Sequence, residues 1–142
     1  MKRQLRLGSA ALIAAWAACA PGLALADVLD DRLKSLGSES VFRSWSPVET
    51  YKGSLDEDKS STVKVSLPRG EYLIMGICDD DCFDLDIEVN HRDGAKLAED
   101  FEDDDVPLVT LKLAEASEIT IRVDMAFCEA GPCAYAVRTF SR

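Results

Sequence analysis

The chain has 142 residues, with 26 acidic and 16 basic side chains and a formal net charge of −10. This balance argues against nucleic acid or anionic lipid as a partner. It favours cations or basic proteins, although acidity also keeps exported proteins soluble. A chain of this length forms one domain around one core.

Residues 1–26 have the features of an export signal. Basic residues open the chain, an apolar, alanine-rich run follows over residues 7–25, and Ala24 to Ala26 form a small-x-small cleavage site. Pro21 and Gly22 break the apolar run, and no second such run follows, so no transmembrane span is expected. Removing three basic and no acidic residues changes the net charge from −10 to −13.

Cys19 offers an alternative, in which this cysteine becomes a lipid-anchored first residue. Trp16 stands where such signals prefer leucine, which favours ordinary cleavage after Ala26. The mature protein is therefore expected to be periplasmic or secreted.

Residues 27–48 are predicted to form a short N-terminal helix or arm. Apolar residues recur at helical spacing from Val28 to Leu36, and Gly37 provides a stop signal. Phe42 and Trp45 follow and are expected to pack on the main core.

Residues 49–142 are predicted to form a β-sandwich domain. Period-two alternation or apolar runs, separated by turn residues, indicate strands at residues 62–67, 71–77, 84–89, 96–100, 108–113, 118–125 and 134–140. The run at 71–77 is apolar on both faces, which is typical of a central strand. Seven or eight short strands with almost no helical pattern after residue 36 indicate an all-β, antiparallel sandwich.

Four cysteines remain after export: Cys78, Cys82, Cys128 and Cys133. An oxidising compartment converts such an even number into disulfides, and three pairings exist. Local pairs within each loop require tight turns, and they are favoured. Chain entropy alone favours a bridge between the loops by about 2 kcal/mol, but only if the loops lie side by side. Zinc is disfavoured, because the spacings are not the usual two residues and His91 is the only histidine.

Carboxylate-rich loops are the second chemical feature. Three aspartates lie between the first two cysteines, two more project from one face of the next strand, and residues 99–105 contain six acids. Calcium takes six to eight oxygen ligands, several of them from carboxylates on bent loops. The candidate calcium ligands are Asp80, Asp84, Asp86, Asp103 and Asp104. The alternative is that these side chains are solvated or cap turns.

The order of several elements between about residues 61 and 140 resembles the bacterial pre-peptidase C-terminal domain. The matching elements are L-P-x-G-x-Y at 67–72, D-L-D at 84–86, a turn at 93–94, acids at 100–105 and ITIRVDM at 119–125. The resemblance implies a jelly-roll-like β-sandwich of the kind often appended to secreted peptidases. It also implies a non-catalytic domain, with calcium sites in some members.

Catalysis would need a nucleophile, a base and a group that orients them. His91 falls in a predicted turn with no serine or cysteine motif near it, and the four cysteines are expected to be oxidised. Paired carboxylates act on glycosidic bonds only inside an enclosed cleft, which a small acidic sandwich does not offer. No catalytic residue is therefore assigned.

The sequence thus predicts an exported, disulfide-bonded, non-catalytic module that binds a protein or cell-envelope component. It requires no cofactor in this interpretation, and calcium is the one candidate ion. The alternatives are a calcium-dependent carbohydrate-binding module and a small secreted hydrolase. Trp45 is the only tryptophan after residue 26, which gives the carbohydrate alternative less support.

Overall fold

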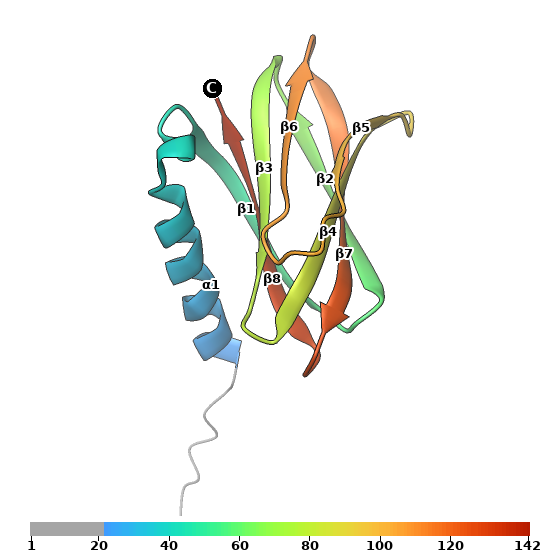
Figure 1. The fold of residues 1–142 in the computed structure, drawn as a ribbon. Helices are drawn as coiled ribbons and strands as arrows, with labels where there is room; N and C mark the ends of the chain where they lie inside the picture. Colours follow the sequence, from blue (N-terminus) through green and yellow to red (C-terminus); the bar gives the residue numbers. More distant parts are fainter. Residues whose placement is uncertain (1–21) are drawn as a thin grey trace, which may run out of the picture.

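A computed structural model describes residues 22–142 and shows an antiparallel β-sandwich flanked by one helix (Figure 1). The elements are α1 (Gly22–Gly37), a 3-10 turn η1 (Ser40–Phe42), β1 (Ser46–Leu55), β2 (Lys59–Leu67), β3 (Gly70–Cys78), β4 (Cys82–His91), β5 (Lys96–Asp100), β6 (Leu108–Leu113), β7 (Ser117–Cys128) and β8 (Cys133–Ser141). The predicted fold class is confirmed.

The strands form two four-stranded sheets. Sheet 1 has the order β1-β8-β3-β6, and sheet 2 has the order β2-β7-β4-β5. The connections β3–β4 and β7–β8 cross from one sheet to the other at the same end of the sandwich, because Cys82 at the start of β4 pairs with Cys128 at the end of β7. Both cysteine loops therefore lie at that end.

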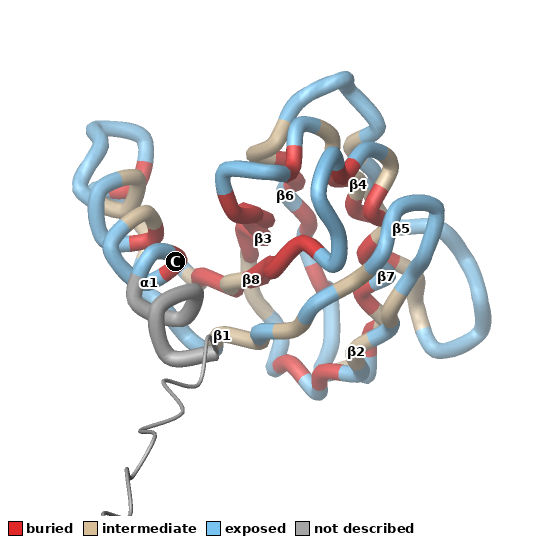
Figure 2. Tube along the Cα trace, turned by 90° about the horizontal axis from the view of Figure 1, so that it is seen from below, coloured by how far each residue is buried: buried red, intermediate tan, exposed pale blue. Residues whose placement is uncertain are grey.

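The core between the sheets comes from the predicted alternation. On β7, the four residues Ile119, Ile121, Val123 and Met125 are all fully buried, and the polar residues between them point outward. Burying each such side chain contributes about 1.5–3 kcal/mol to folding. In Figure 2 the buried positions gather on the strands of the two sheets, whereas most of the connecting loops are exposed.

β3 is apolar on both faces because each face is covered. Ile74 belongs to the core between the sheets, whereas Leu73, Met75 and Ile77 form a second apolar cluster with residues of α1. Leu33 of α1 is fully buried in that second cluster. The predicted helix is therefore a packed third layer on the outer face of sheet 1.

Residues 1–21, which hold most of the predicted export signal and Cys19, lie outside the described residues. α1 begins at Gly22, ahead of the predicted cleavage site, so cleavage after Ala26 would remove its first turn. No helix within residues 22–142 is long and apolar enough to cross a membrane.

β1 was not predicted as a strand, and it begins inside the segment assigned to the arm. Its sequence, SPVETYKGSL, contains a proline and a glycine and has no clear apolar alternation. Packing explains why position 53 holds a glycine, since a Cβ atom there would lie only 2.6 Å from the Tyr135 hydroxyl oxygen on β8. Pairing with β8 along the whole strand thus determines the structure of β1.

Candidate functional site

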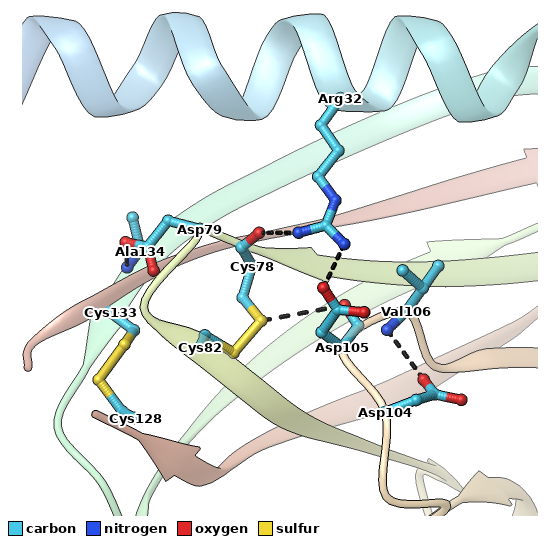
Figure 3. The surroundings of a disulfide bond; sticks show 10 residues. All are labelled: Arg32, Cys78, Asp79, Cys82, Asp104, Asp105, Val106, Cys128, Cys133 and Ala134. Atoms are coloured by element: carbon cyan, nitrogen blue, oxygen red, sulfur yellow. Dashed lines mark hydrogen bonds and ion pairs between the residues drawn. A yellow bond between two sulfur atoms is a disulfide. The ribbon is translucent and has the colours of Figure 1, made fainter. Parts of the chain in front are cut away.

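Both cysteine loops are closed by local disulfides, which confirms the favoured pairing (Figure 3). The Cα atoms of Cys78 and Cys82 are 5.8 Å apart, and those of Cys128 and Cys133 are 6.0 Å apart. Each bridge spans a connection between the two sheets, and disulfides of this kind are typical of proteins from oxidising compartments.

The two loops also lie side by side, as a bridge between them would have required. The Glu129 amide donates to the Asp81 carbonyl at 2.9 Å, and Asp79 exchanges hydrogen bonds with the Ala134 backbone at 2.9 and 2.6 Å. Asp79 is only 6% exposed, and its second carboxylate oxygen has no partner among the described residues. Hydrogen bonds rather than sulfur therefore join one loop to the other.

Arg32 of α1 fastens the acidic loop at residues 101–107 to this end (Figure 3). Its guanidinium donates to the Cys78 carbonyl at 2.7 Å and forms an ion pair with Asp105. The loop in turn supplies the Asp104 and Pro107 carbonyls to amides of β4 and β3, each at 2.9 Å. The amides that donate to the loop belong to Leu85 and Gly76, which lie beyond the ends of the pairing with the short strands β5 and β6. The loop therefore takes the place of a neighbouring strand at these two residues.

We expect Arg32→Gln to loosen this loop and cost about 1–2 kcal/mol, because a charged donor is lost from a half-buried carbonyl and carboxylate. Amide hydrogen exchange at Leu85 and Gly76, which donate to the loop, should accelerate. Lys52→Gln is the matched control, since it removes a more exposed pair between Asp30 of α1 and β1. Unchanged exchange at Leu85 in the Arg32 variant would contradict this role.

An exposed aromatic pair lies on the outer face of sheet 2 beside the cysteine loops. The ring centroids of Phe83 and Phe127 are 5.9 Å apart, and the residues are 51% and 45% exposed. Phe83 occupies a register irregularity, where Cys82 faces Cys128 and the next pair is Asp84 with Phe127. A bulge of this kind re-aims a side chain, and here it brings both rings to the surface.

Next to the two rings, aspartate side chains of β4 and β7 lie on the same outer face of sheet 2. Asp84 lies opposite Phe127 and Asp86 opposite Asp124. We call these three aspartates together with Phe83 and Phe127 the acidic aromatic face. Asp103 and Asp104 of the neighbouring loop add charge close to Asp84.

The electrostatics of this face are unfavourable for its own carboxylates. Burial, as the largest cause, and then the charges of Asp84, Asp124, Asp100 and Asp103 together raise the pKa of Asp86 to about 6. Burial, then Asp103 and Asp104, also raise the pKa of Asp84. Among the described residues, Asp84 and Asp86 form no ion pair, whereas Asp124 pairs with Arg122 at 2.6 Å.

Asp86→Asn is expected to stabilise the protein by about 1–2 kcal/mol at pH 7.5. This range is smaller than the free energy that corresponds to the whole pKa shift of Asp86, because solvent screens the charges. The pKa in the folded state, about 6, exceeds the ordinary value of 3.8. The folded state therefore binds the proton of the Asp86 carboxyl group more tightly than the unfolded state does. The stability that this proton contributes is present at pH 4 and is lost as pH rises through 6.

Urea unfolding of both proteins between pH 4 and 8 measures this effect. The difference between the curves is the informative quantity, because Glu71 and Glu88 have lowered pKa values that act in the opposite direction. The difference in stability should be smallest at pH 4, grow between pH 4 and 6, and stay constant above about pH 6. A constant difference at all pH values would contradict the prediction.

The structure brings together four of the five predicted calcium ligands. Asp84, Asp86, Asp103 and Asp104 interact electrostatically, whereas Asp80 is exposed in the Cys78–Cys82 loop. Within residues 22–142, however, no three His, Cys, Asp or Glu side chains are placed to hold a metal ion together. The carboxylates in this arrangement do not form a ready-made calcium site, and calcium binding stays a prediction.

His91 is the last residue of β4 and not part of the turn itself, which follows at residues 92–94, and its ring is 3.0 Å from the Asp93 carboxylate. This contact and the Ala95 amide lower the pKa of Asp93, with the amide as the larger cause. The four cysteines are oxidised and therefore supply no thiol nucleophile.

Comparisons with known proteins concern the fold alone. No family model and no curated protein matches the chain. Among solved structures, it is similar to the pre-peptidase C-terminal domain of a collagenase from Bacillus anthracis, with a TM-score of 0.48 and 12% sequence identity. The match covers 64% of this chain and 87% of that one. It assigns no residue role or activity to this protein.

Sequence reasoning missed the aromatic pair and Arg32. Phe83 and Phe127 each adjoin a cysteine, where the alternation of their strands is interrupted. In the sequence both residues are in phase with the buried apolar positions of their strands, so alternation alone predicts that they are buried, and only the register irregularity between β4 and β7 exposes them. The partners of Arg32 are distant in sequence, and nothing local marks them.

Proposed function

We propose that this protein is an exported, non-catalytic binding module whose acidic aromatic face binds a basic segment of a partner protein. The observation that carries the proposal is the pair of half-exposed rings, Phe83 and Phe127, beside Asp84 and Asp86, which form no ion pair among the described residues. Aromatic anchors in a patch surrounded by one sign of charge are typical of protein interfaces.

Energetic arguments support a cationic partner. Two like-charged aspartates held close together cost free energy in the unbound protein. A lysine or arginine placed between Asp84 and Asp86 would relieve that repulsion and lower both pKa values. The rings would meanwhile provide apolar contact area, and the surrounding negative field would speed association.

Three other features support the compartment that we propose. Two disulfides, the signal-like residues 1–26 and the strongly acidic surface fit a periplasmic or secreted protein. The partner is accordingly a protein of the cell envelope or its surroundings. A carbohydrate ligand is less favoured at this face, because neither ring carries a polar group and the neighbouring side chains are charged.

A comparative pull-down from cell-envelope extract tests the proposal. The bait variants are wild type, Phe83→Ser/Phe127→Ser, and a control, Val48→Ser/Leu97→Ser, which also replaces two exposed apolar residues. Wild type and control should capture the same protein with a basic segment, and the face variant should lose it. Equal capture by all three baits, with equal melting temperatures, would overturn the proposal.

A further inference from the structure

An open groove of about 610 Å³ lies on the outer face of sheet 1, away from the acidic aromatic face. Strands β3 and β6 supply most of its lining, and the segment between η1 and β1 contributes Trp45. α1 packs on β3 and β8, whereas β6 is the edge strand of the sheet. A volume of this size is typical of sites for small ligands.

Arg142 is held in a defined orientation at this groove. Its guanidinium carbon lies 4.5 Å from the centre of the Trp45 ring, and its Nε donates to the Glu71 carboxylate at 2.8 Å. Its backbone amide also donates to the Glu71 carbonyl at 3.2 Å. Within residues 22–142, the two terminal nitrogens of the guanidinium make no hydrogen bond, so a pre-positioned pair of donors remains available.

The side chains that line the groove include two positive and one negative charge, in a strongly acidic chain. The Lys112 Nζ atom lies 3.3 Å from Oε1 of Glu71, whereas Arg142 donates to Oε2 of the same carboxylate. Hydrogen bonds from Arg142 and then Lys112 lower the pKa of Glu71, so this carboxylate stays ionised and keeps both cations in place. Apolar surface adjoins them, with Val41 51% and Leu108 37% exposed.

We infer that this groove binds a ligand in which a carboxylate is attached to an apolar body. A planar guanidinium with two free donors matches a carboxylate in geometry, and Lys112 adds a second positive charge. Leu108 and Val41 provide contact surface for the apolar body. This ligand has the opposite charge to the basic segment proposed above. The two sites also lie on different sheets, so each can be tested without the other.

NMR titration of the isotope-labelled protein with N-acetyl-leucine tests the inference, and N-acetyl-leucinamide is the matched probe without a carboxylate. The acid should shift the Trp45 indole signal and the backbone signals of residues 108–112 in a saturable manner, with Kd on the order of 1 mM. The amide should bind at least about tenfold more weakly. Equal shifts from both probes, or none from the acid, would overturn the inference.

Two variants and one longer probe sharpen the test. Arg142→Gln should weaken binding of the acid about tenfold, whereas Arg69→Gln, which removes an exposed arginine outside the groove, should leave it unchanged. Equal loss in both variants would indicate bulk charge and contradict the site. Acetyl-Ala-Ala-Leu binding more tightly than N-acetyl-leucine would identify a peptide C-terminus as the source of the carboxylate, and equal affinity would identify a small organic acid.

Discussion

Replacing all four cysteines by alanine should lower the free energy of unfolding by about 4 kcal/mol, because each bridge closes a short loop worth about 2 kcal/mol. The two pair variants, C78A/C82A and C128A/C133A, should each lose about half of that amount. Chemical denaturation measures all three. A loss well below 1 kcal/mol in the quadruple variant would contradict a stabilising role for the bridges.

The same pair variants test the connectivity. Local bridges predict that C78A/C82A retains an intact Cys128–Cys133 disulfide and shows no free thiol by intact-mass analysis after alkylation. Bridges between the loops would instead leave two thiols to react. The hydrogen bonds between Asp79 and Ala134 should preserve the arrangement of the loops in either variant, so the thiol count reports on the sulfur pairing alone.

Leu33→Ala should cost about 3 kcal/mol, because a fully buried leucine is replaced where α1 packs on sheet 1. Val28→Ala on the same helix is the control, since Val28 is 41% exposed and should change stability by less than about 0.5 kcal/mol. Urea denaturation measures both variants. Equal small effects would show that α1 is not part of the cooperative unit.

Most of the fold could be predicted because the strands are amphipathic. The alternation on β7 and on β4 indicates which residues face the core, and the structure agrees. The apolar character of β3 on both faces correctly indicates a central strand, but only the structure shows that the predicted helix covers its outer face. β1 could not be predicted, because its conformation depends on pairing with β8 rather than on its own pattern.

Less of the candidate site could be predicted. The local disulfides follow from spacing and turn geometry, and the carboxylate face of β4 follows from its alternation. The rings of Phe83 and Phe127 meet only because β4 and β7 pair with a register irregularity. Arg32 and Arg142 form hydrogen bonds with partners that are 46 to 73 residues away in sequence, which no local pattern encodes.

Site-specific photo-crosslinking tests most directly whether the acidic aromatic face is a binding surface. A benzophenone side chain in place of Phe127 should capture a basic protein segment in the cell envelope, and the same group at Val48, which is similarly exposed, should not. The yield at position 127 should fall as the salt concentration rises, because screening weakens attraction to the carboxylates. Capture of the same protein from both positions, or none from position 127, would contradict the proposed function.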